Sequence, residues 1–306
     1  DFGMGTLLPF LAKNDEEKRI IYNAAGPYWD GNEVWLITAG GVTFAAFPKA
    51  YAVMFSALYA PLLILLFALI FRAVSFEFRN KKDCPQWRKF WDACQFLGNF
   101  LPALLLGVAF ANLFMGIPID GNGVYHGNII KLLNPYGLAG GIFFVLIFAM
   151  HGALWLALKS EGDIHERAVG AAQVVWPLVL AVALLFLALT AFYTNLYANY
   201  AEHPTLLVFP ILAVASLLTV RVMIWADNLL GAWFFSALFI ITVTFFGVLG
   251  MYPGIIISSI DPAYSVTVFN GASSPLTLKI MLGVTLCCIP VVIAYQAWVY
   301  YTFAHK

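Results

Sequence analysis

Apolar stretches long enough to cross a lipid bilayer recur along almost the whole chain, and they constrain its fold more than any other feature. A membrane-spanning helix needs about 20 mostly apolar residues, because the hydrocarbon layer is about 30 Å thick. Of the 306 residues, 62% are hydrophobic and only 10% are charged, whereas soluble domains carry about 25% charge. The sequence therefore predicts an all-α fold, a polytopic transmembrane helix bundle.

Short polar loops divide these stretches into about nine spans. We expect them near residues 1–12, 29–48, 51–73, 93–117, 136–158, 169–193, 205–224, 228–252 and 276–303. The first stretch is shorter than a span, so we expect the chain to begin part-way through its first transmembrane helix. Gly40, Gly41 and Pro48 interrupt the second, and one long broken helix over 29–73 is an open alternative.

No polar stretch is long enough to fold as a separate soluble domain. We therefore expect a single integral membrane domain over residues 1–306, built from helical bundles over approximately 1–158 and 169–303. Lysine and arginine predict its orientation, because they concentrate in cytoplasmic loops. If the loop 13–19 faces the cytoplasm and the spans alternate, all sixteen basic residues except Lys49, Lys131 and Lys279 lie on that side. This places the N-terminus outside and the C-terminus, with Lys306, in the cytoplasm.

Charge and metal-binding side chains exclude several function classes. The formal net charge is zero, and the basic patch of a nucleic-acid-binding protein is missing. Four cysteines, two of them adjacent in an apolar span, do not predict a disulfide framework. Only His151 lies inside a span, next to Met150, which points elsewhere around the helix. A membrane haem needs a second axial ligand, so we expect neither haem ligation by this chain nor a metal site.

Three acidic residues at the start of apolar stretches are candidates for a proton path: Asp1, Asp30 and Glu33. A carboxylate in hydrocarbon costs about 2.5–3.5 kcal/mol, so it is usually retained for a task. Asp1 precedes Ala12 by eleven residues, about 16 Å of helix, which places it near the middle of the membrane. Two structural alternatives remain open. Asp1 could form an ion pair with a neighbouring helix, and Asp30 with Glu33 could form a capping box.

Four further residues are candidates for a quinone or subunit contact: Trp29, Asn32, Trp35 and Arg72. The two tryptophans flank the acidic residues, although an interfacial aromatic belt would also explain them. Arg72 ends the third predicted span. It either reaches the cytoplasmic headgroups as an anchor, or pairs with a buried carboxylate such as Asp30, or binds a haem propionate or lipid phosphate.

Several segments, densest in 1–115, resemble the second, haem-free subunit of cytochrome bd-type quinol oxidases. They are DFGMG (1–5), the block 26–78 that contains WDGNEVW (29–35), FR (71–72), GVAFANL (107–113), LNPYGL (133–138) and ASSPLTL (272–278). The cyanide-insensitive members of the family share the pattern, so the resemblance does not separate the subtypes.

The resemblance implies a heterodimer in a bacterial or archaeal cytoplasmic membrane. The larger, haem-bearing subunit I would bind two b-type haems, one haem d and quinol, and the complex would reduce dioxygen to water and generate proton motive force without pumping. This chain would support subunit I and contribute to a cytoplasmic proton path. Asp1 and Asp30 stand at the family's acidic positions. Trp29 and Arg72 also stand at positions that match the family's pattern. A structural quinone, a small accessory transmembrane subunit and membrane lipids complete the implied partners.

Two other functions compete with this hypothesis. A proton-coupled secondary transporter often shows broken helices in corresponding positions of both halves, but here the acidic residues and helix breaks concentrate in the first third. A purely structural membrane scaffold is the other alternative.

Overall fold

The computed structural model describes residues 1–303, so His305 and Lys306 lie outside the described residues. The elements in chain order are α1 (Phe2–Leu11), α2 (Asp15–Ala25), α3 (Trp29–Ala46), α4 (Pro48–Ala57), α5 (Tyr59–Phe78), α6 (Pro85–Met115), α7 (Ile129–Leu132), α8 (Pro135–Lys159), α9 (Gly162–Tyr193), α10 (Leu196–Glu202), η1 (Pro204–Leu207), α11 (Val208–Trp225), α12 (Leu229–Met251), β1 (Gly254–Ile256), η2 (Pro262–Tyr264), β2 (Val266–Thr267), α13 (Val268–Gly271) and α14 (Pro275–Thr302).

The described residues contain seven helices that are long and apolar enough to cross a membrane: α5, α6, α8, α9, α11 with η1, α12 and α14. This confirms the predicted polytopic helix bundle. Two of the predicted spans fall outside this set. Helix α1 is apolar but has ten residues, and α3 has eighteen residues that include Asp30, Asn32 and Glu33 in its first two turns.

The predicted second and third spans are three helices rather than two. Helix α3 ends at Ala46, and Pro48 begins α4 at its first position, because proline lacks the N–H that a continuous helix would need. Helix α4 ends at Ala57, and Leu58 leaves the helical conformation before α5 begins. Glu33 near the start of α3 pairs with Arg72 near the end of α5, so the two helices run antiparallel. The alternative of one broken helix over 29–73 is therefore wrong, and the third span begins at Tyr59 rather than at residue 51.

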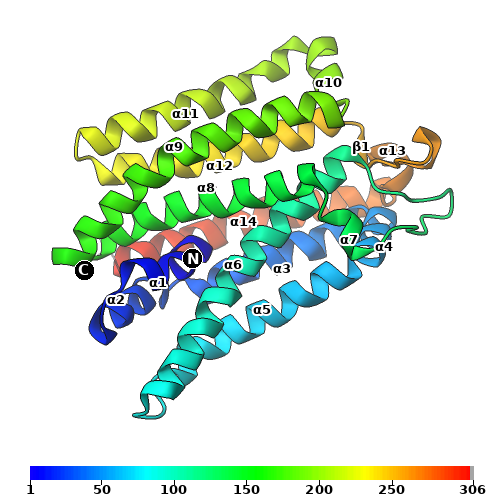
Figure 1. The fold of residues 1–306 in the computed structure, drawn as a ribbon. Helices are drawn as coiled ribbons and strands as arrows, with labels where there is room; N and C mark the ends of the chain where they lie inside the picture. The colour runs from blue at the N-terminus through cyan, green and yellow to red at the C-terminus, as the bar shows by residue number, and fades with distance from the viewer. Residues whose placement is uncertain (304–306) are drawn as a thin grey trace.

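The connecting segments gather at the two ends of the bundle (Figure 1). One end carries α4, α7, α10, α13 and the two-stranded antiparallel sheet β1–β2. The other carries α2, the α5–α6 loop and the α8–α9 and α11–α12 turns. The second end holds the basic loops of the sequence, and we call it the basic end.

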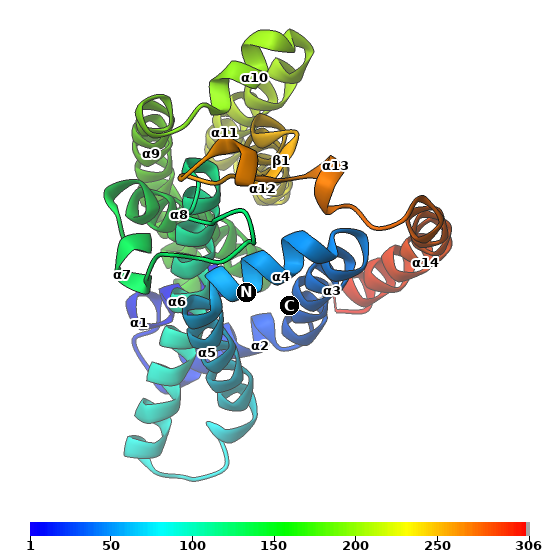
Figure 2. The ribbon, with the colours of Figure 1, turned by 90° about the vertical axis from the view of Figure 1, so that its right-hand side faces the viewer.

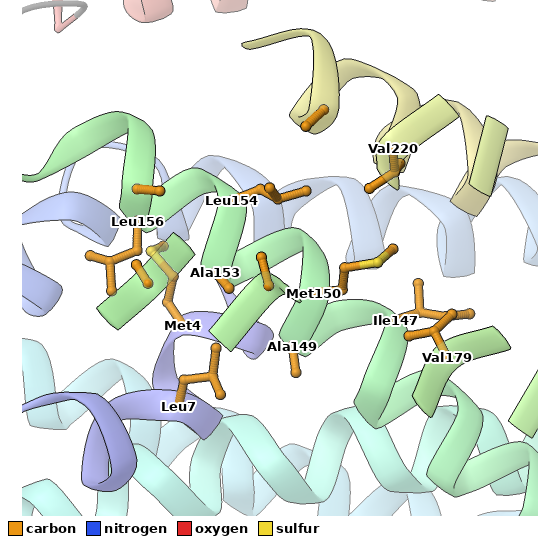
Figure 3. Close-up of a cluster of buried hydrophobic side chains, with 14 of the residues drawn as sticks. Met4, Leu7, Ile147, Ala149, Met150, Ala153, Leu154, Leu156, Val179 and Val220 are labelled. Carbon is orange, nitrogen blue, oxygen red and sulfur yellow. The ribbon is translucent and has the colours of Figure 1, made fainter. Parts of the chain in front are cut away.

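Helix α8 is the centre of the fold and packs against α1, α6, α9 and α12. Its side chains Met150, Ala153 and Leu154 are fully buried. They belong to one buried cluster, in which Met4 of α1 lies on one side of α8 and Val220 of α11 on the other (Figure 3). Helix α1 comes so close that a Cβ on Gly152 would lie 2.5 Å from the backbone nitrogen of Met4, so only glycine allows this contact.

Helices α3 and α14 are the least buried long helices. Only Ala46 of α3 is buried, and no described residue of α14 is. Viewed from the end of the bundle, α14 stands apart beside α3 (Figure 2). The outward faces of α3, α5 and α14 thus expose large apolar side chains: Val34, Trp35, Ile37, Leu66, Phe67, Ile70, Leu282, Leu286 and Ile293.

Candidate functional site

Arg72 of α5 lies in a buried ion-pair cluster with two of the predicted acidic residues. Its side chain is 1% exposed, and Nη2 lies 3.3 Å from Oδ2 of Asp1, while Nη1 donates a short hydrogen bond to Oε1 of Glu33. Asn32 donates a 2.7 Å hydrogen bond to the same Asp1 oxygen. A buried cation needs such partners, because removing them would leave an uncompensated charge.

Close helix packing and aromatic rings fix the arginine. A Cβ on Gly98 of α6 would lie 2.6 Å from Cβ of Arg72, so glycine lets α6 approach α5 at this level. The guanidinium lies 5.1 Å from the ring centre of Phe2, and the rings of Trp29 and Phe76 stack against each other about 6 Å away. Aromatic faces attract cations at such distances.

Some buried polar atoms in and near the cluster have no hydrogen-bond partner among the described residues. Nε and Nη2 of Arg72 and Oδ1 of Asn99 are buried without a hydrogen-bond partner in the described chain; the contact from Nη2 to Asp1 is an ion pair without hydrogen-bond alignment. Buried polar atoms are rarely left unpaired, and ordered water commonly satisfies them. Each of these three atoms can therefore form a further hydrogen bond, as with water.

A row of polar side chains leads from Arg72 to the basic end. Ser75 donates 2.5 Å and 2.6 Å hydrogen bonds to Oε1 of Gln95 and to the carbonyl of Arg72, and Asn99 donates to the carbonyl of Gln95 at 2.6 Å. Ser75, Gln95 and Asn99 are all buried. Asn99 in turn reaches α1, since a Cβ on Gly5 would lie 2.0 Å from its amide nitrogen, one helical turn from Asp1.

The row ends in a charged cluster at the basic end. Arg79 donates 2.6 Å hydrogen bonds to Asp92 of α6 and to Asp15 of α2, and Lys18 pairs with Asp92 at 2.8 Å. The Tyr22 hydroxyl lies 3.4 Å from Oδ1 of Asp92 and 3.4 Å from the carbonyl of Trp91. We call Arg72, Ser75, Arg79, Asp92, Gln95 and Asn99 the α5–α6 polar path.

The electrostatics of this charged cluster favour an ionised Asp15 and a protonated Tyr22. Partial burial alone would raise the pKa of Asp15. The hydrogen bond from Arg79 and the charges of Arg79, Arg88 and Lys18 outweigh that effect and hold its pKa below the usual value. Burial, together with the charge of Asp92, raises the pKa of the Tyr22 hydroxyl. Tyr22 therefore keeps its proton and acts as a hydrogen-bond donor.

The sequence predictions on α3 divide into two groups. Asn32 and Glu33 lie in the cluster, and Trp29 stacks on Phe76 at 5.1 Å. Asp30 is exposed, and Trp35 is 37% exposed on the outward face. The capping-box alternative is wrong, because Tyr28 is the N-cap of α3 and Asp30 lies within its first turn.

Two expectations about Arg72 also need correction. The side chain does not reach outward as a headgroup anchor, since it is buried, and its acidic partners are Asp1 and Glu33 rather than Asp30. Helix geometry decides this, because Arg72 faces α6 and α1 from the inner side of α5, while Asp30 points away from that interface.

His151 lies in the packed contact between α8 and α12. Its Nδ1 lies 2.7 Å from Oγ of Ser236, and its ring stacks on Trp233. The neighbouring Met150 is fully buried in the apolar core. In the described part of the chain, no three His, Cys, Asp or Glu side chains gather as a metal site would require.

Sequence reasoning missed Ser75, Gln95 and Asn99. Their signal is the spacing of polar residues within apolar helices. Arg72 and Ser75 of α5 and its C-cap residue Arg79 repeat at three and four positions, and Asp92, Gln95 and Asn99 do so on α6. Residues at these spacings share one helix face, so each series marks a polar face that must be turned away from lipid.

Comparison with known proteins shows to which family the chain belongs. Residues 1–303 match the model of the family described as cytochrome bd terminal oxidase subunit II. The chain belongs to this family. Cytochrome bd ubiquinol oxidase subunit 2 of Bacillus subtilis is 37% identical over 312 residues, which cover 100% of this chain and 90% of that protein. Cytochrome bd-I ubiquinol oxidase subunit 2 of Escherichia coli K12 is 35% identical over 337 residues, covering 98% and 88%.

A solved structure agrees in fold. A chain from the structure of bd oxidase from Geobacillus thermodenitrificans superposes with a TM-score of 0.77 over 100% of this chain and 92% of that chain, at 16% sequence identity. As a cytochrome bd subunit II with seven apolar helices of spanning length in its described part and bacterial relatives, the protein is a multi-pass subunit of the cytoplasmic membrane and part of a quinol:oxygen oxidoreductase complex.

Proposed function

We propose that this subunit II supports a haem-bearing subunit I and delivers cytoplasmic protons toward it along the α5–α6 polar path. The observation that carries the proposal is the buried Arg72 bound to Asp1 and Glu33 at the inner end of that path. The positive-inside rule supports a cytoplasmic basic end, with the N-terminus of the first helix outside and about nine spans in all.

The proposed chemistry needs protons but no redox group from this chain. Two quinols reduce one dioxygen to two waters, and the four electrons pass through haems, two of type b and one of type d, that we assign to subunit I. Four protons must reach the oxygen. Uptake of these protons from the cytoplasm, with release from quinol outside, would generate proton motive force without pumping.

The described side chains suit proton uptake in three stages. Asp92 and Tyr22 lie at the basic end, where protons enter. Ser75, Gln95 and Asn99 order the water along which protons move, because their hydroxyl and amide groups both donate and accept hydrogen bonds. Asp1 and Glu33 receive the protons, while Arg72, which stays charged, holds these carboxylates in place.

Asp30 continues the path to the surface of the subunit. It is three residues from Glu33, so the two carboxylates are neighbours on α3, and it is exposed in the isolated chain. A carboxylate facing acyl chains would be costly. We therefore assign the outward face of α3, with Asp30 and Trp35, to the contact with subunit I.

The exposed surfaces of α3 and α14 are also the proposed contacts for partners and cofactors. Of the four residues predicted for a quinone or subunit contact, Trp35 is available to the partner, while Trp29, Asn32 and Arg72 are engaged in the cluster. A structural quinone or a small accessory transmembrane subunit would then bind beside α14, the helix with no buried residue. Membership of the oxidase family leaves the transporter alternative without support.

Proteoliposomes containing the whole oxidase complex test the proposal. Quinol-driven oxygen consumption and proton uptake are measured for Asp1→Asn and Glu33→Gln, with the haem spectrum as a check on assembly. We expect both rates to fall together while the spectrum is unchanged, and Glu33→Asp to retain more activity than Glu33→Gln. Unchanged rates in fully assembled variants would favour the structural scaffold.

A further inference from the structure

A furrow on the opposite side of the molecule from the ion-pair cluster is a candidate lipid site. Helices α9 and α11 are tied together near the basic end, where Trp176 donates to the carbonyl of Leu217 at 2.7 Å and Arg221 to that of Gln173 at 3.3 Å. Toward the opposite end of the bundle, α9 and α11 line a shared space together with α6, α8 and α12.

The space between these helices is apolar. A cavity of about 160 Å³ is lined by side chains that are almost all aromatic or aliphatic, among them Phe110, Phe143 and Phe239. An apolar cavity of this size stays dry and binds apolar groups. On α9 it extends from Leu180 to Leu187, about 10 Å along the helix. Its rim residue Leu184 is 60% exposed, so the cavity opens toward the acyl chains of the bilayer.

A polar pocket of about 440 Å³ continues the cavity at the end opposite to the basic end. Phe114 lines both, and the lining of α12 passes from Phe246 to Gly250 within about one turn. The polar groups of the pocket come from α10 and its flanks and from the end of α12: Tyr193, Thr194, Asn195, Asn199, Glu202 and Tyr252. An apolar cavity next to a polar pocket matches the apolar tail and polar headgroup of a lipid.

The charges in the pocket select the headgroup. Glu202 is the one charged side chain among the described residues that line it, and none of these is Lys or Arg. The pocket therefore disfavours a headgroup with net negative charge and favours an ammonium group beside Glu202. Tyr193 and Tyr252 are both partly exposed there and offer hydroxyl donors to phosphate oxygens.

We propose that this furrow binds one phospholipid whose headgroup carries a primary ammonium, such as phosphatidylethanolamine. A segment of one acyl chain fills the cavity between α9, α11 and α12, and the headgroup lies beside α10. The bound lipid completes the packing between these helices. This proposal is independent of the proton path.

Lipid retention by the purified, haem-containing complex tests the site. Detergent first removes loosely bound lipid from the complex. Separate samples are then exposed to vesicles of phosphatidylethanolamine, to vesicles of phosphatidylglycerol, or to vesicles of phosphatidylcholine that contain quinone. After washing, mass spectrometry identifies the lipid or quinone that the complex retains. We expect selective retention of phosphatidylethanolamine. Glu202→Gln should lower it about two- to fivefold, the range of an exposed ion pair, whereas Asp261→Asn, at the same end but outside the pocket, should not.

A pair of α9 variants tests the tail cavity. Ala183 lines the cavity and Ala181 is exposed outside it, so Ala183→Phe should abolish retention and Ala181→Phe should leave it unchanged. If the complex with Ala183→Phe does not assemble, Ala213→Phe on α11 is used instead, because Ala213 lines the same cavity. The Glu202→Gln variant tests the headgroup site independently of both. Retention of phosphatidylglycerol or quinone instead, or full retention in the cavity-filling variants, would overturn the proposal.

Discussion

Ser75 on α5 donates a 2.5 Å hydrogen bond to Oε1 of Gln95 on α6, and both side chains are buried. The two side chains lie along α5 and α6 between the charged cluster at the basic end and the Arg72 cluster deeper in the bundle. Leaving one partner of a buried hydrogen bond unpaired costs about 1–3 kcal/mol, so this pair stabilises the contact between α5 and α6.

Interrupting the α5–α6 polar path should slow the oxidase without dissociating it. We expect Gln95→Leu and Ser75→Ala to lower proton uptake and oxygen consumption at least about tenfold, which corresponds to ~1.4 kcal/mol in the barrier. Measurements in proteoliposomes with the haem spectrum recorded in parallel check this. Ser216→Ala, at a buried serine of α11, is the matched control and should leave both rates unchanged.

Removing the cation of the buried cluster should destabilise the subunit strongly. Arg72→Met leaves two partly buried carboxylates without their partner, and breaking a buried pair costs about 3–5 kcal/mol. Arg88 also binds carboxylates, but its side chain is 32% exposed, so Arg88→Met should cost no more than about 1 kcal/mol. Thermal unfolding of the complex compares them. Equal effects of the two substitutions would contradict the assignment of Arg72 as a buried, paired charge.

The contact between α5 and α6 depends on the missing side chain of Gly98. A Cβ there would lie 2.6 Å from Cβ of Arg72 and 2.7 Å from the carbonyl of Ala68. Gly98→Ala should therefore lower the free energy of unfolding by about 1–3 kcal/mol, as overpacking does. At Gly170 of α9 nothing lies within 4 Å, and Gly170→Ala should raise stability or leave it unchanged. A Gly98→Ala complex as stable as the Gly170→Ala complex would mean that the helices do not approach this closely.

Acid should weaken the charged cluster at the basic end. The pKa of Asp15 lies below its usual value of about 3.9 in the folded protein. Its stabilising contribution is thus complete above pH 4 and is lost as the pH falls below that value. Asp15→Asn should make the unfolding temperature less dependent on pH between about 5 and 3. Asp83→Asn, at a carboxylate 95% exposed beside Arg88, serves as the control, and an identical pH dependence in both variants would refute the prediction.

The sequence by itself determined the class of the protein and most of its helices. Apolar stretches of spanning length have no other stable arrangement than membrane helices, and Pro48 marked a helix boundary without any knowledge of the neighbours. Asp1, Glu33 and Arg72 were recognisable as candidates because charges are rare in such stretches.

Only the tertiary structure decided which of these charges meet. Helical periodicity places a residue on a face but does not say which other helix that face contacts. Arg72 therefore pairs with Asp1 and Glu33 rather than with Asp30, and Asp30 lies on the outer surface. The partners of Ser75, Gln95 and Asn99 depend equally on the close approach of α5 and α6 at Gly98, a contact between segments far apart in the chain that no local pattern specifies.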